Sequence, residues 1–308
     1  AKVNYMDVLG SVKYWDILIY NYLRDKNIVI PQKKKSDKSE KFEGAYVKEP
    51  QVGMHKWVMS FDLNSLYPHL IMQYNISPET VNLQTRQVKK MTVDKLLSKE
   101  TDLSGMRERQ LTMTPNGALF KTSKKGFLSE MMETMYNDRV KYKRLMLQSK
   151  QQYEDTKDPK CLKDISKYNN IQMAKKISLN SAYGAIGNEW FRYFDVDMAE
   201  AITLSGQLSI RWIADHLNDF LNKTVGTEDY DYVVASDTDS VYLRLGNLVE
   251  KVCGSRSKSE VVEFLDKASR EIILPFIEKQ YNKLASTMNA YENKMVMDRE
   301  CIADKAVW

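Results

Sequence analysis

The sequence is poor in the residues on which zinc sites and disulfide frameworks depend. Its 308 residues include only three cysteines and three histidines. Cys161, Cys253 and Cys301 lie far apart and form no CxxC pair, and the histidines form no spaced motif. A scattered, odd set of cysteines argues against structural zinc and against a disulfide scaffold, and it is typical of a reducing compartment.

Long apolar runs are missing as well. No stretch of about 18 apolar residues marks a membrane span, and the chain does not open on the pattern of a secretory signal peptide. We therefore expect a cytoplasmic protein with no membrane partner. The charge is close to balanced, since 46 Lys and Arg face 41 Asp and Glu, for a formal net charge of +5. A mildly basic chain is compatible with nucleic acid binding but does not establish it.

The most informative short motif is an acidic turn between two apolar runs. Residues 232–235 precede it and residues 241–243 follow it, so the turn through Asp237, Thr238 and Asp239 predicts a β-hairpin. Side chains two apart in an extended segment share a face, which would aim both carboxylates at one place, as a Mg²⁺ site requires. The alternative is a polar surface turn, because Asp is favoured in turns anyway.

A second acid strengthens the metal interpretation. Residues 57–61 form a strand-like run that leads into Asp62 and then to Pro68. Ligands tend to bind beyond strand ends. An acid at one strand end plus a pair in a hairpin can hold two metal ions about 3.5–4 Å apart, the arrangement used for in-line phosphoryl displacement. The sequence therefore predicts that Asp62, Asp237 and Asp239 converge.

The remaining patterns outline the fold. Strands are expected at 44–47, 57–63 and 294–303, and helices at 14–23, 129–152, 164–184, 199–221 and 257–291, the last broken at Pro275. Helices 129–152 and 164–184, joined by a turn at 155–163, predict an antiparallel hairpin. The Lys- and Ser-rich stretch 32–41 is read as a solvated loop, with a DNA contact as the alternative. These elements predict an α+β fold in which a mixed, mainly antiparallel sheet carries the acids.

Three motifs resemble motifs A, B and C of family B DNA polymerases and occur in the same order. They are DLNSLYP at 62–68, KISLNSAYG at 176–184 and DTDS at 237–240. The segments NISPET at 75–80 and NEWFRY at 188–193 are similar to the polymerases of T4-like bacteriophages. The resemblance spans nearly the whole chain, and it implies a polymerase palm with an inserted two-helix fingers hairpin, in the cytoplasm of an infected bacterial host.

The resemblance also implies a domain organisation. Residues 1–35 would precede the palm as the end of an N-terminal domain, residues 36–126 and 189–308 would form the palm, and residues 127–188 the fingers. The chain opens without Met and stops at Trp308, before the family's thumb. We therefore expect a fragment that lacks the thumb and the exonuclease and is weak or inactive alone.

The implied activity is template-directed transfer of a nucleotide from a dNTP to a primer 3′-hydroxyl, with release of pyrophosphate. The implied partners are primer–template DNA, dNTP, a C-terminal thumb polypeptide and replisome proteins. One alternative is a subunit of a split polymerase, inactive until a partner supplies the thumb. An unrelated metal-dependent hydrolase is a weaker alternative, because it leaves Tyr67, Lys176, Asn180 and Tyr183 unexplained.

Site roles follow from the same resemblance. Asp62 and Asp239 would bind two Mg²⁺ ions, for which Mn²⁺ can substitute. Asp237 would be a weaker or water-mediated ligand, and the Leu63 carbonyl would complete the nucleotide-side ion. Glu300 resembles a third acidic site, with an ion pair to Arg299 or another neighbour as the alternative.

The dNTP would be held by side chains of the hairpin. Arg139 and Lys143 lie four apart on one helix face, and Lys176, Asn180 and Tyr183 form one stripe on the next helix. Guanidinium and ammonium groups suit phosphate oxygens. For Arg139 and Lys143 the alternative is a solvated face.

The remaining roles concern the sugar and the bases. Ser65 and Leu66 would offer backbone amides to the phosphates. Tyr67 would exclude a 2′-hydroxyl, with a core tyrosine as the alternative. Tyr183 and Gly184 would form the floor beneath the nascent base pair. Tyr46 belongs to a segment that resembles the family's template-contacting strand.

Overall fold

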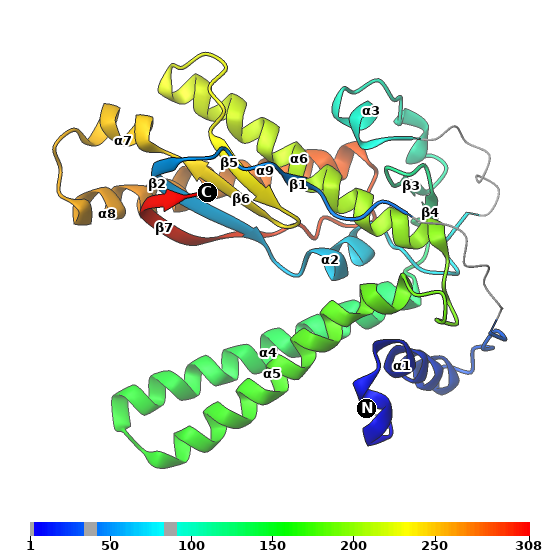
Figure 1. Ribbon diagram of the computed structural model, residues 1–308. Helices are drawn as coiled ribbons and strands as arrows, with labels where there is room; N and C mark the ends of the chain where they lie inside the picture. The colour runs from blue at the N-terminus through cyan, green and yellow to red at the C-terminus, as the bar shows by residue number, and fades with distance from the viewer. Residues whose placement is uncertain (1–2, 34–41, 83–90) are drawn as a thin grey trace.

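An antiparallel sheet and a long helical hairpin dominate the computed structural model, which describes residues 3–33, 42–82 and 91–308 (Figure 1). The strand order of the sheet is β1-β5-β6-β2-β7. In that order the strands are Val47–Lys48, Val233–Asp237, Ser240–Arg244, Met54–Leu63 and Met297–Val307. Helices together with an antiparallel sheet confirm the expected α+β class. The expectation of a mixed sheet is wrong for the described residues, because every strand pair in them is antiparallel.

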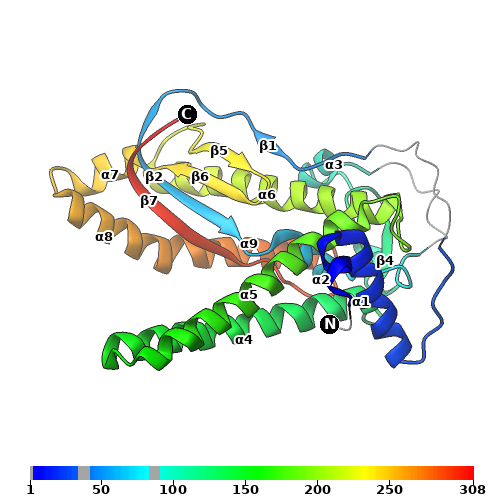
Figure 2. The ribbon, with the colours of Figure 1, turned by 60° about the horizontal axis from the view of Figure 1, so that its bottom comes forward.

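Helix α6 packs along the sheet and is capped at both ends. It spans Val196–Val225 and buries Ile210, Ile213, Leu217 and Leu221, which are three or four residues apart and so share one face. The Asp195 side chain accepts from the backbone N–H of Met198 at its start, and it ends at Gly226, whose φ of +73° suits glycine. Figure 2 shows α6 running along the strands.

Three more helices follow the hairpin of β5 and β6, namely α7 (Gly246–Cys253), α8 (Lys258–Ala268) and α9 (Leu274–Thr287). The expected break at Pro275 is wrong. A π-helical turn, Ser269–Ile273, joins α8 to α9, and Pro275 lies in the first turn of α9. The wider turn accommodates the ring and the missing N–H of proline, so the chain continues as helix.

The helical hairpin consists of α4 (Phe127–Thr156) and α5 (Pro159–Ile186). The connection is shorter than the predicted turn, because Pro159 starts α5, where its fixed φ and missing N–H are tolerated, and Asp158 caps the helix. Along the chain the hairpin lies between β2 and β5. Its base packs against α1 (Ser11–Asp25) and α2 (Leu66–Gln73).

The segment 75–80 fixes the start of α4. The side chains of Asn75, Ser77 and Glu79 accept from the backbone N–H groups of Gly126, Leu128 and Phe127, at 2.8, 3.3 and 2.5 Å. These contacts satisfy amides that a helix start leaves unpaired. A Cβ at Gly126 would lie 2.5 Å from the Ser77 Cβ, so only glycine fits this close approach.

Several smaller elements complete the fold. Helix α3 (Val93–Leu97), the 3₁₀ turns η1 (Tyr5–Leu9) and η3 (Ser104–Met106), and the strand pair β3 (Leu111–Met113) and β4 (Leu119–Lys121) were not predicted. The expected strand at 44–47 starts only at Val47. Most of the predicted loop 32–41, including the expected boundary at 35–36, lies outside the described residues. No helix in the described ranges is long and apolar enough to cross a membrane.

Candidate active site

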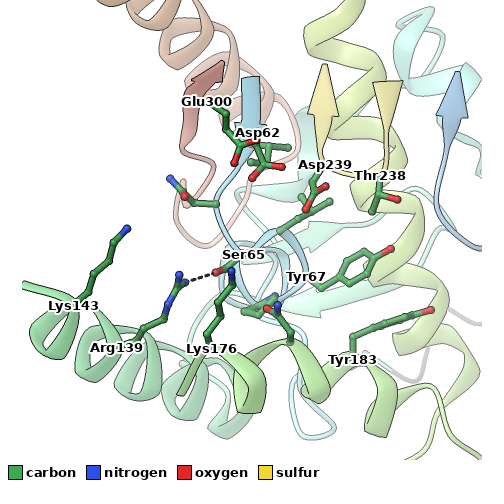
Figure 3. A pocket seen from close by; sticks show the side chains of 15 residues that line it. Asp62, Ser65, Tyr67, Arg139, Lys143, Lys176, Tyr183, Thr238, Asp239 and Glu300 are labelled. Atoms are coloured by element: carbon green, nitrogen blue, oxygen red, sulfur yellow. Dashed lines mark hydrogen bonds between the residues drawn. The ribbon is translucent and has the colours of Figure 1, made fainter. Parts of the chain in front are cut away.

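A cavity of about 660 Å³ lies where the sheet meets the base of the hairpin (Figure 3). The sheet side supplies Asp62, Asp239 and Glu300, while the hairpin supplies Arg139, Lys143 and Lys176. Acidic groups therefore face basic groups across one space. Its other lining residues are Leu63, Asn64, Ser65, Leu66, Tyr67, Pro68, Asn180, Tyr183 and Thr238.

Strand register brings the carboxylates together. Asp62, near the end of β2, is paired with Ser240 on one side and Asp298 on the other. The Leu63 N–H donates to the Asp239 carbonyl at 2.8 Å, which fastens the β5–β6 turn to β2. Glu300 sits at a register shift where β7 carries one residue more than β2. Such a bulge re-aims side chains, and Figure 3 shows Glu300 directed toward Asp62.

The carboxylates of the cavity disfavour one another's charge. Burial raises the pKa of Asp62 to about 6, and the charges of Asp239 and Glu300 add to the rise. The pKa of Asp239 is also raised, first by burial and also by the charges of Asp237 and Glu300. A bound cation would relieve the repulsion between these carboxylates. Mg²⁺ prefers such carboxylate oxygens as ligands. The described side chains nevertheless contain no cluster of three His, Cys, Asp or Glu residues close enough to form a complete metal site.

The turn between β5 and β6 separates its two acids. Asp237 is exposed and does not line the cavity, and its Oδ1 accepts from the Thr238 hydroxyl at 2.9 Å. Thr238 has a φ of +52°, which is unusual for a β-branched residue. The Asp239 N–H donates to the Asp237 carbonyl at 2.5 Å, an i→i+2 bond typical of a γ-turn. The structure therefore brings Asp62 and Asp239 to the cavity, joined by Glu300 in place of Asp237.

A second residue with positive φ lies at the start of α2. Ser65 has a φ of +48° and accepts from Arg139 Nη1 through its hydroxyl, at 3.0 Å (Figure 3). Its carbonyl accepts from the His69 backbone N–H at 3.2 Å and bonds His69 Nδ1 at 2.9 Å. The His69 ring is buried edge-on against Tyr136, and burial lowers its pKa. Sequence reasoning gave His69 no role, although its position four residues after Ser65 on a helix would have allowed this contact.

The basic residues of the hairpin differ in their hydrogen-bond and ion-pair partners. Arg139 donates to Ser65, and its buried Nε has no hydrogen-bond partner among the residues that the structure describes. Lys175, next to Lys176, pairs with Asp138 at 2.6 Å between the two helices. Lys176 itself is exposed and lines the cavity. One face of the hairpin thus directs positive charge into the cavity.

Two tyrosine rings close one end of the cavity. Tyr67 and Tyr183 have ring centroids 4.5 Å apart at an interplanar angle of 41°. Burial raises the pKa of Tyr67 to about 12, helped by Tyr183 and Asp239, so its phenol stays neutral. Gly184, the next residue on α5, is exposed, and a Cβ there would meet nothing within 4 Å. Tyr46 does not line the cavity, and the Arg211 guanidinium lies 5.4 Å from its ring centroid.

Comparison with known proteins gives one consistent answer. The family model described as DNA polymerase family B matches residues 11–272. The chain is 33% identical over 98% of its length to the DNA-directed DNA polymerase of Escherichia phage RB69, and 32% identical over 98% to that of Enterobacteria phage T4. It is 28% identical over 83% of its length to the DNA polymerase delta catalytic subunit of Candida albicans. The chain spans 38% of each phage relative and 22% of the Candida one. Since the family model covers most of it, this chain belongs to DNA polymerase family B.

Proposed function

We propose that this chain is the palm and fingers of a DNA-directed DNA polymerase and that the cavity is its site of nucleotidyl transfer. The observation that carries the proposal is the facing arrangement of acidic and basic side chains in one cavity. A dNTP has an anionic triphosphate and needs both cationic side chains and metal-binding carboxylates. In this assignment α4 and α5 are the fingers, within residues 127–188, and the sheet belongs to a palm formed by residues 36–126 and 189–308.

The carboxylates are assigned to metal binding. Asp62 and Asp239 would hold two Mg²⁺ ions, with the Leu63 carbonyl as a further ligand, whereas Asp237, which does not line the cavity, would contribute only through a bound water. Bound ions supply Lewis-acid activation of the primer 3′-hydroxyl and neutralise the triphosphate. Mn²⁺ has the same preference for oxygen ligands and is expected to substitute. The mutual repulsion of Asp62, Asp239 and Glu300 supports this assignment, because it disfavours an arrangement without cations.

The basic face is assigned to the triphosphate. Arg139, Lys143 and Lys176 neutralise charge, and Asn180 donates a hydrogen bond from the same stripe of α5. The backbone amides of Ser65 and Leu66 lie at the start of α2, where helical N–H groups have no partner within the helix and favour anions. The hydrogen bond from Arg139 to Ser65 ties the basic face to this amide site.

The tyrosine pair is assigned to the sugar and the base pair. Tyr67 lines the cavity and packs against Tyr183 at a tilted angle, so the deoxyribose of a dNTP held by the cations would lie near the Tyr67 ring. Gly184 would let the nascent base pair approach the α5 backbone. Glycine inside a helix is destabilising by about 1 kcal/mol relative to alanine, and no protein atom near Gly184 explains it.

Replacing Tyr67 tests the sugar assignment. In Tyr67→Ala, incorporation of ribonucleotides relative to deoxynucleotides should rise about 10–100-fold, because the ring that clashes with the 2′-hydroxyl is gone. The ratio is measured by single-nucleotide primer extension with matched rNTP and dNTP. Tyr67→Phe keeps the ring and should discriminate as the unaltered chain does. Equal discrimination by Tyr67→Ala would make Tyr67 a packing residue only.

Primer extension tests the proposed function itself. We expect divalent-metal-dependent, template-directed addition of dNTP at low salt, weak for the chain alone because few phosphate contacts hold the duplex. Addition of a polypeptide corresponding to the C-terminal part of the phage relatives should raise it, and a chain wholly inactive until then would favour the split-subunit alternative. Absence of template-directed addition in both arms would refute the proposal.

A further inference from the structure

One segment beside the acidic turn is held by several side-chain hydrogen bonds in addition to those of its short strand. We call residues 43–51 the strap. Its only strand is the two-residue β1, which pairs with β5 at the sheet edge, Val47 opposite Asp237 and Lys48 opposite Ser236. Two residues of pairing cannot by themselves hold a register at an edge. Side chains must therefore set the position of the strap.

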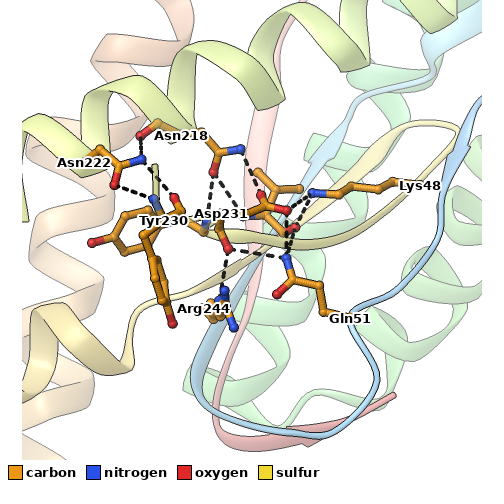
Figure 4. A network of polar contacts seen from close by, with 9 residues as sticks. Lys48, Gln51, Asn218, Asn222, Tyr230, Asp231 and Arg244 are labelled. Carbon is orange, nitrogen blue, oxygen red and sulfur yellow. Dashed lines mark hydrogen bonds and ion pairs between the residues drawn. The ribbon is translucent and has the colours of Figure 1, made fainter. Parts of the chain in front are cut away.

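A cluster centred on Asp231 anchors the C-terminal half of the strap (Figure 4). The Asp231 carboxylate accepts from Lys48 Nζ at 2.6 Å, Gln51 Nε2 at 2.8 Å and Asn218 Nδ2 at 2.9 Å. Lys48 Nζ also donates to the Val233 carbonyl at 2.6 Å. Burial raises the pKa of Asp231, but the hydrogen bonds and charge of Lys48, with Asn218, outweigh it and leave the pKa below its usual value.

Helix α6 anchors the other half. Thr203 donates its hydroxyl to the Glu43 carbonyl at 2.7 Å, and Gln207 Nε2 donates to the Gly44 carbonyl at 2.8 Å. The strap is thus fixed at both ends, and Tyr46 lies between the anchors. The Tyr46 carbonyl accepts the Thr238 N–H at 3.0 Å.

This hydrogen bond reaches the strained residue of the acidic turn. Thr238 has a positive φ, and of the two acids that flank it Asp239 lines the cavity while Asp237 does not. A strained backbone persists only where its surroundings over-determine it. We propose that Lys48 and Asp231 are positioning residues that, through the strap and the Tyr46 carbonyl, hold the Asp237–Asp239 turn in the form that presents Asp239.

The consequence for catalysis rests on the proposed function, whereas the restraint on Thr238 can be measured without activity. Hydrogen exchange of the Thr238 amide, followed by NMR of ¹⁵N-threonine-labelled protein, should become about 10-fold faster in Lys48→Ala and in Asp231→Ala, since either change frees the acceptor strand. The double variant should add little to either single change, because both remove one interaction. Lys48→Arg keeps the charge and should restore part of the protection.

Two controls separate positioning from general destabilisation. Lys26, the residue after α1, forms an ion pair of similar length, 2.7 Å, with Glu130 on α4. Lys26→Ala removes this pair and should leave Thr238 exchange unchanged. Amides of β7, read by mass spectrometry, report unfolding of the whole sheet and should keep their rates in every variant. Unchanged Thr238 exchange in Lys48→Ala, or an increase shared equally by β7, would overturn the inference.

In a form that extends primers, Lys48→Ala should also lower kcat about 10-fold with little change in the KM for dNTP, because no residue of the strap lines the cavity that contains Arg139, Lys143 and Lys176. Faster Thr238 exchange with normal kcat would refute only the catalytic half of the inference. If no form extends primers, the proposed function fails while the exchange result still decides the restraint.

Discussion

Asp239→Asn should strongly lower the rate of nucleotide incorporation while leaving the fold intact. The amide keeps the size of the side chain but removes a charge from the carboxylate side of the cavity. Loss of one preorganised charge-stabilising group typically lowers the rate by about 10²–10³-fold. The measurement is single-turnover addition of one dNTP, in whichever form extends primers best, the chain alone or complemented.

The melting temperature of this variant distinguishes a catalytic role of Asp239 from a structural one. In the folded protein burial and neighbouring charges disfavour the ionised form of Asp239, so removal of its charge should leave the melting temperature unchanged or raise it. Asp304→Asn is the matched control, because Asp304 lies on β7, is partly exposed and pairs with Lys258. An Asp239→Asn protein with a normal rate would remove Asp239 from the site, and one that melts early would show a structural role.

Lys176→Ala should lower the efficiency of dNTP incorporation by about 10²-fold, the scale of losing a charged group that stabilises the transferring phosphates. Lys176 is exposed to the cavity, so its truncation leaves no buried gap and should not change the melting temperature. Both kcat and the KM for dNTP are measured. An unchanged pair of constants would contradict the assignment.

The adjacent lysine provides the control for this experiment. Lys175 has the same chemistry and lies on the same helix, but it forms an ion pair with Asp138 between α4 and α5. Lys175→Ala should therefore leave the kinetic constants close to those of the unaltered chain. Equal losses in both variants would indicate that the positive charge of the helix acts as a whole, and not that Lys176 has a specific contact.

Local periodicity predicted the main elements of the fold. The helical spacing of apolar residues located α1, α4, α5 and α6, and the Asp-Thr-Asp turn located the hairpin of β5 and β6. The helix ends were less predictable, because capping residues such as Asp158 and Asp195 lie outside the apolar pattern.

Helical register also predicted that Arg139 and Lys143 share a face of α4 and that Lys176 and Asn180 share a face of α5, and the structure has all four lining the same cavity. Pairing between distant segments was less accessible to sequence reasoning. The bulge that directs Glu300 toward Asp62 exists only in the register of β7 against β2. The expected convergence of Asp237 with Asp239 assumed extended backbone between them, but Thr238 has positive φ, so the two-residue periodicity fails there. The Thr238 N–H donates a hydrogen bond to the Tyr46 carbonyl, which lies far away in the sequence.

The pairing of β2 with β7 has a consequence for how the protein folds during synthesis. Asp62 lies early in the chain and its neighbour Asp298 lies near the other end, so this part of the sheet is among the most non-local contacts of the molecule. Closing so long a loop is entropically unfavourable, and contacts of this kind form late. While the ribosome translates the residues between β2 and β7, β2 has no β7 to pair with. The helical hairpin of α4 and α5 can therefore form before β2 has joined the sheet. The carboxylate side of the cavity is therefore complete only after β7, which carries Glu300, has emerged and paired with β2.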